Sequence, residues 1–214
     1  MKYEKEYQEN AHNYLCTDKR YYRLRANISF EDYFRKNFRY LGGSFDVKGK
    51  KILEYGCGLG QNIYIANLFG WDVTGYDISK FALEFCKKKD IPVINKLTGV
   101  YDVIFCRHVL EHVKNPYETL QTIRKHLKKG GILDLIIPYE RHRKVSFEPD
   151  HNGHLWGWNF RCINNLLGEL GFKVIKNEVL VEGDGYYKLK SAWLAKIAGW
   201  VRGCRALRIV AVWK

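Results

Sequence analysis

The stretch Lys51-Ile-Leu-Glu-Tyr-Gly-Cys-Gly-Leu-Gly60 decides the fold of this chain. Its first half, residues 51–55, predicts a buried strand, and the glycines that follow lead into a helical segment at residues 61–69. Glycines let the backbone turn tightly and let a ligand lie against bare main chain, and the N–H groups at the next helix start favour an anionic group. The spacing is GxGxG rather than GxGxxG because position 61 is Gln, which argues against a nicotinamide dinucleotide. A tight strand–helix turn without a ligand is the alternative interpretation.

A second strand, residues 71–76, follows that helix and leads directly into Asp77. A carboxylate at the tip of the second strand can accept both hydroxyls of a ribose. The glycine loop and this acid together predict a site for a nucleoside, and the ligand does not have to contain a pyrophosphate.

Hydrophobic periodicity and turn residues predict the later elements. They are a helix from a Ser79 cap to about residue 89, a strand at 91–94, a strand at 102–106, a helix from Asn115-Pro116 that ends at Gly130-Gly131, a strand at 132–138, a helix at 159–170, and strands at 172–181 and 207–213. Asn as cap with Pro in the first position is a favourable helix start. A pair of glycines is a common helix end.

Five segments of the chain resemble the class I S-adenosylmethionine-dependent methyltransferases, in order and with the family's spacing. They are Glu54-Tyr-Gly-Cys-Gly-Leu-Gly60, Gly75-Tyr-Asp-Ile78, Tyr101-Asp-Val-Ile-Phe105, Val109-Leu-Glu-His-Val113 with Asn115-Pro116, and Leu127-Lys-Lys-Gly-Gly-Ile132. The resemblance is closest to the small-molecule branch that includes the ubiquinone-biosynthesis O-methyltransferases. It implies a Rossmann-like three-layer α/β/α sandwich whose seven-stranded sheet is mostly parallel with the last strand antiparallel. It also implies a helical lid at 1–42 and a methyltransferase domain at 43–214, with a helical insertion at 182–206.

The cofactor implied by this resemblance is S-adenosyl-L-methionine. The residues that it assigns to the cofactor are Glu54, Gly56, Gly58, Gly60, Asp77, Ile78, Asn95, Cys106 and Arg107. The family often has an acid after the third strand that contacts the adenine amino group, and here Asn95 could substitute through its amide oxygen. Arg23, Arg25 or Arg35 could pair with the cofactor carboxylate through a planar guanidinium, unless these arginines are solvated helix residues.

Methyl transfer to a hydroxyl requires a group that removes the proton, and histidine is the natural base near neutral pH. The first candidate is His108, just past the fourth strand. If residues 108–112 form a helical turn, His108, Glu111 and His112 converge at i, i+3 and i+4, and they are then also weak candidates for a divalent-metal site. In the ubiquinone O-methyltransferases the matching positions carry acid, acid and histidine, so only Glu111 and His112 match. Relatives without metal carry the same pair, so a metal is a secondary expectation.

The loop at 139–158 is the second place where catalytic residues are expected, because long structureless loops are usually functional or disordered. It carries His142, Asp150, His151, His154, Trp156 and Trp158. The interpretation is an acceptor pocket with His151 or His154 as the base and the tryptophans stacked on a ring or sugar face. In the alternative, the tryptophans anchor the loop and the histidines lie on the surface.

The charge and composition limit the partners. The formal net charge of +13 predicts attraction to nucleic acid, phosphorylated substrates or an acidic membrane surface, and a Lys-rich solvated surface is the alternative. The six cysteines form no CxxC pair, and the first residues form no apolar signal region, so a cytoplasmic protein with reduced thiols is expected. A basic helix at 188–204 that carries Trp193 and Trp200 suits peripheral membrane contact or a lipid-linked acceptor, or else simply packs over the domain.

The leading functional hypothesis is O-methylation of a small, glycan-like or lipid-linked hydroxyl acceptor. An RNA methyltransferase is the second hypothesis, although the fourth strand ends in Phe105-Cys-Arg-His108 and lacks both the Pro-Pro-Tyr and the Pro-Cys signatures of base methylation. A non-catalytic cofactor-binding partner protein is the third. The sequence leaves the oligomeric state open.

Overall fold

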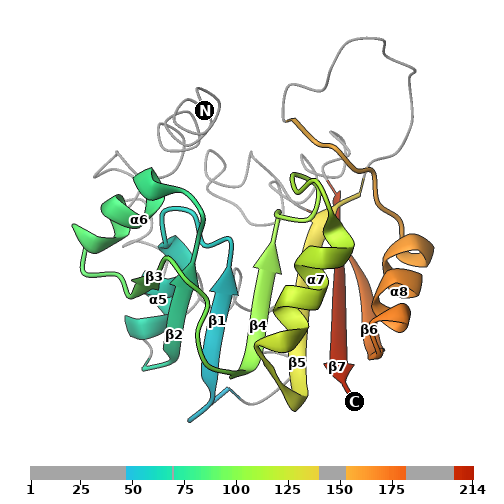
Figure 1. The fold of residues 1–214 in the computed structure, drawn as a ribbon, viewed down its shortest axis with the longest axis horizontal. Helices are drawn as coiled ribbons and strands as arrows, with labels where there is room; N and C mark the ends of the chain where they lie inside the picture. The colour runs from blue at the N-terminus through green and yellow to red at the C-terminus, as the bar shows by residue number, and fades with distance from the viewer. Residues whose placement is uncertain (1–46, 69, 140–152, 182–204) are drawn as a thin grey trace. The chain divides into compact units, whose positions relative to one another are not determined.

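The computed structural model describes residues 47–68, 70–139, 153–181 and 205–214, and the structural statements below concern these residues (Figure 1). The elements are β1 (Lys51–Tyr55), α5 (Gln61–Leu68), β2 (Asp72–Tyr76), α6 (Lys80–Lys87), β3 (Val93–Ile94), β4 (Tyr101–Arg107), α7 (Pro116–Lys125), β5 (Leu127–Pro138), α8 (Phe160–Glu169), β6 (Phe172–Val181) and β7 (Arg205–Trp213). The strand order of the seven-stranded sheet is β3-β2-β1-β4-β5-β7-β6, and β7 is antiparallel to β5 and β6. This is the predicted Rossmann-like class. The chain divides between Leu97 and Thr98 into two compact units, called unit 1 and unit 2.

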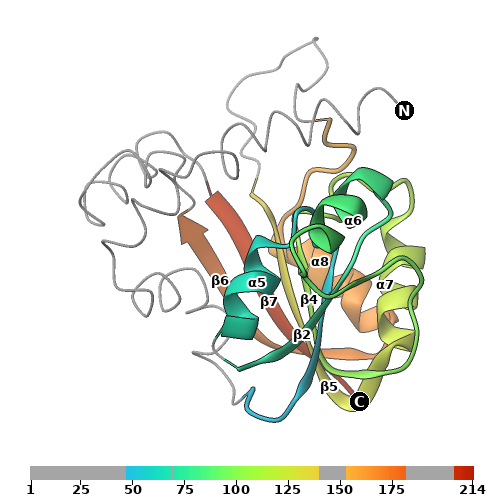
Figure 2. The same cartoon turned by 90° about the vertical axis from the view of Figure 1, so that its left-hand side faces the viewer.

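Unit 1 contains the parallel strands β1, β2 and β3 with helices α5 and α6. Ile52 and Leu53 of β1 are fully buried, as is Ile63 of α5. α5 packs against β2 (Figure 2). At Gly75 of β2, an added β-carbon would collide with Cδ1 of Ile63 and would lie 2.6 Å from Sγ of Cys57. Only glycine allows this close approach. Ser79 caps α6 as predicted, because its hydroxyl accepts from the N–H of Ala82 at 3.2 Å.

Unit 2 contains β4, β5, β7 and β6 with helices α7 and α8. Asn115 caps α7 as predicted, but the predicted helix end at Gly130-Gly131 is wrong, because α7 ends at Lys125 and Leu127 already pairs with Tyr101 in the sheet. The pairing register shifts between Tyr101 and Val103, so β5 contains a bulge. Gly130 has a φ of 77°, which a bulge accommodates as readily as a helix end does.

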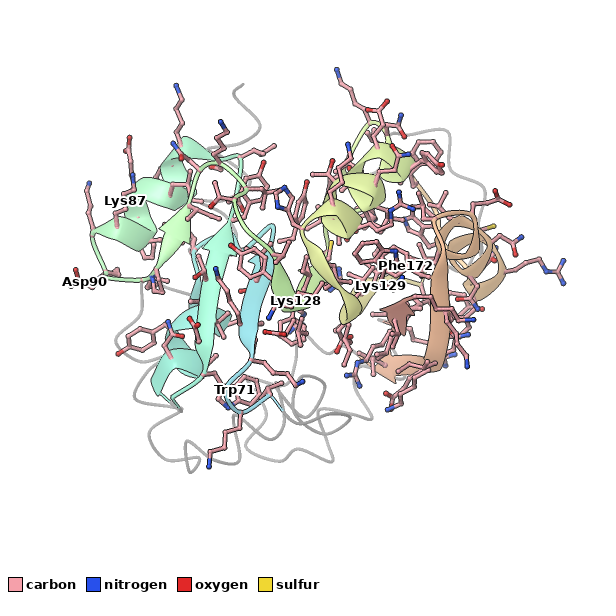
Figure 3. All side chains as sticks on the ribbon, turned by 60° about the horizontal axis from the view of Figure 1, so that its bottom comes forward. Trp71, Lys87, Asp90, Lys128, Lys129 and Phe172 are labelled. Atoms are coloured by element: carbon pink, nitrogen blue, oxygen red, sulfur yellow. The ribbon has the colours of Figure 1, made fainter. Side chains whose placement is uncertain are left out.

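The bulged start of β5 is tied to β4 by an ion pair. Nζ of Lys128, labelled in Figure 3, lies 2.7 Å from Oδ1 of Asp102. Both side chains are partly exposed, so this pair contributes at most about 1 kcal/mol. It helps to set the register but does not carry the stability of the sheet.

The last strand, β7, contains a fully buried arginine. Arg208 and Asp134 are each 1% exposed, and Nη2 of Arg208 lies 2.6 Å from Oδ2 of Asp134, with Nε at 2.9 Å from Oδ1. Burial raises the pKa of the Asp134 carboxyl to about 6, and the Arg208 guanidinium opposes that rise. A buried charge is tolerated only when it is paired in this way.

Several predicted features lie outside the described residues. These are the lid at 1–42, most of the loop at 139–158 including His142, Asp150 and His151, and the basic helix at 188–204. Arg205 and Ala206, which the prediction placed in the insertion, belong to β7. Among the helices that the structure describes, none is both long and apolar enough to cross a membrane.

Candidate functional site

Main-chain hydrogen bonds tie the glycine loop that follows β1 to the end of β2. The N–H groups of Gly56 and Cys57 both donate to the carbonyl of Tyr76, at 2.7 and 3.0 Å. Gly58 and Gly60 have φ values of 52° and 70°, in the left-handed region that favours glycine. An added β-carbon at Gly60 would lie 2.8 Å from the Ile91 side chain, whereas at Gly58 it would meet nothing within 4 Å. The loop therefore presents bare main chain and open space at Gly58.

Asp77, at the tip of β2, is clamped to this loop. Its Oδ2 accepts from the N–H of Gly58 at 2.8 Å, and its Oδ1 accepts from the N–H of Ser79 at 2.9 Å. The residue is only 8% exposed. Each carboxylate oxygen has a second acceptor position, so the pair can still receive two hydroxyl groups. The next residue, Ile78, is 81% exposed, which is unusual for a large apolar side chain.

Glu54, at the end of β1, is 5% exposed and accepts a hydrogen bond from Nδ2 of Asn62 at 2.5 Å. Its carboxylate and that of Asp77 both act on Cys57. A hydrogen bond with Cys86, burial and these two negative charges raise the pKa of the Cys57 thiol, so the thiol stays protonated.

The remaining predicted cofactor residues have differing environments. Asn95 follows β3 in unit 1 and is exposed. In unit 2, Cys106 is fully buried near the end of β4, so its side chain belongs to the core and only its main chain could contact a ligand. Arg107 is half-buried at the end of the same strand. The assignment of these three residues to the cofactor stays a prediction.

The segment after β4 is not the helical turn that the spacing suggested. His108 has a φ of 51°, a value that costs energy for a non-glycine residue and that clusters at functional sites. A single turn then closes through the N–H of His112 and the carbonyl of Val109 at 3.0 Å. Glu111 nevertheless lies between the two histidines, since its Oε1 is 3.1 Å from Nδ1 of His108 and 4.0 Å from Nε2 of His112.

A third histidine joins this group from the end of the long loop. The ring of His154 lies 5.0 Å from the ring of His112 in an edge-to-face arrangement. The ligand atoms of Glu111, His112 and His154 all lie within 4.8 Å of one another, and these three residues are called the Glu111 cluster. Glu111 is fully buried, and its Oε2 has no hydrogen-bond partner among the described residues. Two imidazoles and one carboxylate form a donor set that suits a divalent transition metal.

Burial lowers the pKa of His112, and the Glu111 carboxylate opposes this shift. His112 is therefore neutral at physiological pH, which is the form that binds a metal or accepts a proton. Trp156 and Trp158 follow His154 in the described part of the loop, and their stacking on an acceptor stays a prediction. Trp158 is 7% exposed, and Nε1 of Trp156 donates to the carbonyl of Val113 at 2.7 Å.

The mainly parallel sheet, the open glycine loop and the clamped Asp77 define a class of protein. They are the features of a Rossmann-like domain that binds a nucleoside where its strands end. The model of the methyltransferase domain family matches residues 21–177. The chain belongs to that family, which confirms the predicted resemblance.

Curated relatives include two ubiquinone biosynthesis O-methyltransferases. The protein of Coxiella burnetii is 29% identical over 108 residues, which cover 44% of this chain and 46% of the relative. The protein of Vibrio cholerae is 33% identical over 97 residues, which cover 39% of this chain and 40% of the relative. The chain thus matches less than half the length of these relatives.

Solved structures of similar fold include an S-adenosylmethionine-dependent methyltransferase from Mesorhizobium loti, with a TM-score of 0.62 and 16% identity over 81% of this chain and 95% of that one. An O-methyltransferase from a trans-AT polyketide synthase of Brevibacillus brevis was solved with S-adenosyl-L-homocysteine. It has a TM-score of 0.60 and 18% identity, over 89% of this chain and 79% of that one. At identities of 16% and 18%, these similarities support the fold alone.

Proposed function

We propose that this chain transfers a methyl group from S-adenosyl-L-methionine to a hydroxyl group of a small acceptor. The observation that carries the proposal is the glycine loop of unit 1, where open space at Gly58 lies beside the clamped carboxylate of Asp77. Membership of the methyltransferase domain family supports the choice of cofactor. The names of the curated relatives support a hydroxyl acceptor.

Three residues of unit 1 would hold the nucleoside. Asp77 would accept the two ribose hydroxyls on the lone pairs that its main-chain partners leave available. Ile78, exposed beside it, would be covered by the adenine ring, which removes apolar surface from water. Gly58 would allow the ligand to lie directly on the main chain. When bound, the cofactor supplies a methyl group on a positively charged sulfur, which is already a good leaving group.

The acceptor hydroxyl must lose its proton as the new oxygen–carbon bond forms, and His108 of unit 2 is the proposed base. The Glu111 carboxylate fixes the proton of His108 on Nδ1, so that Nε2 is the nitrogen that can accept a proton. The buried negative charge of Glu111 then stabilises the imidazolium that results. The His108 side chain is 36% exposed, so solvent-sized molecules can reach it.

A divalent metal is a second candidate for the same task. The Glu111 cluster supplies the donor set, and the Oε2 of its carboxylate has no hydrogen-bond partner within the residues that the structure describes. A bound metal would act as a Lewis acid and lower the pKa of an acceptor hydroxyl. Ubiquinone-type acceptors, glycans and lipid-linked alcohols all carry such a hydroxyl.

The experiment for the cofactor is calorimetric titration of the full chain with S-adenosyl-L-homocysteine. We expect micromolar binding, and we expect Asp77→Asn to weaken it by about tenfold or more, because a charged hydrogen-bond acceptor contributes about 1.5–3 kcal/mol. The matched control is Asp90→Asn on the exposed turn after α6, where Asn tolerates the φ of 56° and binding should stay unchanged (Figure 3). Absence of binding to the unmodified chain would overturn the proposed function.

A further inference from the structure

A cavity of about 450 Å³ opens in unit 2 beside the first turn of α8. It is lined by Tyr139, Asn159, Phe160, Arg161, Val179 and Arg205. These residues come from the end of β5, the start of α8, the second half of β6 and the start of β7, elements that lie together in unit 2 (Figure 1). Small-molecule sites occupy about 300–1,000 Å³, so the cavity has room for a ligand.

The charge of the cavity is positive. Arg161 and Arg205, which carry guanidinium groups, line it, and no Asp or Glu is among the lining residues that the structure describes. Within the described part of the chain, neither arginine forms an ion pair. The carboxylate of Glu178 on β6 is held by Lys176 at 3.0 Å and by Arg208 at 3.5 Å. The two guanidinium groups therefore attract an anion, and the positive end of the α8 dipole adds to that attraction.

Three of the other four lining residues are apolar or aromatic, and the fourth is Asn159. Tyr139 and Phe160 are aromatic, and Val179 is 46% exposed, which is high for a large apolar residue in a strand. A ligand that covers these side chains removes apolar surface from water, at about 25 cal/mol per Å². The lining thus suits a molecule that joins an anionic group to an apolar or aromatic body.

The frame of the cavity is fixed by main-chain hydrogen bonds. The N–H of Tyr139 donates to the carbonyl of Arg205 at 2.8 Å, so the end of β5 is tied to the start of β7. Asn159 caps α8 through the N–H of Cys162 at 3.0 Å. Because the residues that present both arginines are held in this way, a ligand does not have to order the backbone when it binds.

We propose that this cavity binds the anionic end of the methyl acceptor, and that the acceptor is a small phosphate ester with an apolar or aromatic body. That the ligand is the methyl acceptor rests on the proposed function. The place of the site rests on the position of the cavity at the carboxyl end of β5, where open sheets bind their ligands. Two guanidinium groups match the double charge of a phosphate monoester better than the single charge of a carboxylate. The net charge of +13 favours the same class of ligand.

The test is calorimetric titration of the full chain with phenyl phosphate, with benzoate as the singly charged comparison, in the presence of S-adenosyl-L-homocysteine. We expect phenyl phosphate to bind more tightly than benzoate. The double variant Arg161→Gln/Arg205→Gln should weaken phenyl phosphate binding by about tenfold or more, as expected for the loss of charged hydrogen bonds. The control is Lys173→Gln on the exposed start of β6, which removes a charge from the same unit outside the cavity and should change binding by less than about twofold.

The outcomes separate the two proposals. If S-adenosyl-L-homocysteine binds but phenyl phosphate does not, or if Lys173→Gln weakens phenyl phosphate as much as the double variant does, the cavity proposal is overturned and the proposed function stands. Equal affinity for benzoate overturns the choice of a phosphate. Arginine-dependent binding of phenyl phosphate by a chain that does not bind S-adenosyl-L-homocysteine retains the phosphate site and overturns its role as an acceptor site. The double variant Arg161→Lys/Arg205→Lys, which keeps both charges, should retain more affinity than the glutamine variant.

Discussion

The glycine loop of unit 1 depends mainly on main-chain conformation, whereas the Glu111 cluster of unit 2 depends on contacts between side chains. Gly56, Gly58 and Gly60 sit in adjacent turns, and their positive φ values are a local requirement. Glu111 and His154 come from different segments and meet only because the fold brings them together. A site of the first kind depends on backbone conformations that few residues can adopt. A site of the second kind depends on the burial and pairing of charges, so it responds to pH, metal and distant substitutions.

The ion pair between Asp134 and Arg208 is a second place in unit 2 that depends on buried, paired charges. Its loss gives the largest expected effect. Replacing Asp134 by Leu leaves Arg208 buried without the Asp134 carboxylate, and Oε2 of Glu178 lies farther away, at 3.5 Å from Nη1 of Arg208. Loss of one member of a buried ion pair costs about 3–5 kcal/mol, so we expect the free energy of unfolding in urea to fall by about that amount. The double variant Asp134→Leu/Arg208→Met should recover most of the loss, because two apolar residues then replace two charges. A loss below about 1 kcal/mol in the single variant would show that the pairing of charges does not dominate unit 2.

Substitutions would show which side chains of the Glu111 cluster bind a metal. We expect Glu111→Gln and His154→Gln to weaken Zn²⁺ binding by at least about tenfold, because each removes a ligand from a set of three. His108→Gln should leave Zn²⁺ affinity within about twofold, since His108 lies outside that set. His126→Gln is the surface-histidine control, because its Nδ1 bonds the carbonyl of Gly99 elsewhere in unit 2.

Chelator competition with the four variants would measure these affinities. A loss of Zn²⁺ affinity in His108→Gln with no loss in His154→Gln would favour the predicted set of His108, Glu111 and His112. Failure of the unmodified chain to bind Zn²⁺ would leave proton transfer as the role of the cluster.

The same contrast explains what the sequence could predict. β1 and β6 have the predicted bounds, and Ser79 and Asn115 cap their helices, because strand alternation and capping depend on neighbouring residues. The glycine pair at 130–131 was misassigned because a helix end and a β-bulge both accept positive φ, and only the pairing partner distinguishes them.

The partners of charged residues were harder to predict than the elements that carry them. Nothing near Arg208 in the sequence indicates that Asp134, 74 positions earlier, lies within hydrogen-bond distance. Glu111 was correctly placed beside His108 and His112, since all three lie in one short segment. The contact between His112 and His154 required the fold, which brings the end of the long loop onto the turn after β4.

The smallest expected effect is the pH dependence that His112 gives to stability. Burial lowers its pKa below the ordinary 6.5, so between the folded-state pKa and 6.5 the unfolded chain binds more protons than the folded chain does. The contribution of His112 to the free energy of unfolding should therefore fall as the pH decreases from 6.5 through the folded-state pKa, and it should be fully present above 6.5. The raised pKa of Asp134 gives a slope of opposite sign below about pH 6, so the contribution of His112 is the difference between the unmodified chain and the His112→Gln variant. His112→Gln should flatten this part of the profile, and His126→Gln, on the surface of the same unit, should leave it intact. Urea unfolding of the metal-free protein between pH 5 and 7.5 would measure both slopes. If His112→Gln keeps the slope, another group causes the pH dependence, and the Glu111 cluster does not contain a buried neutral imidazole at His112.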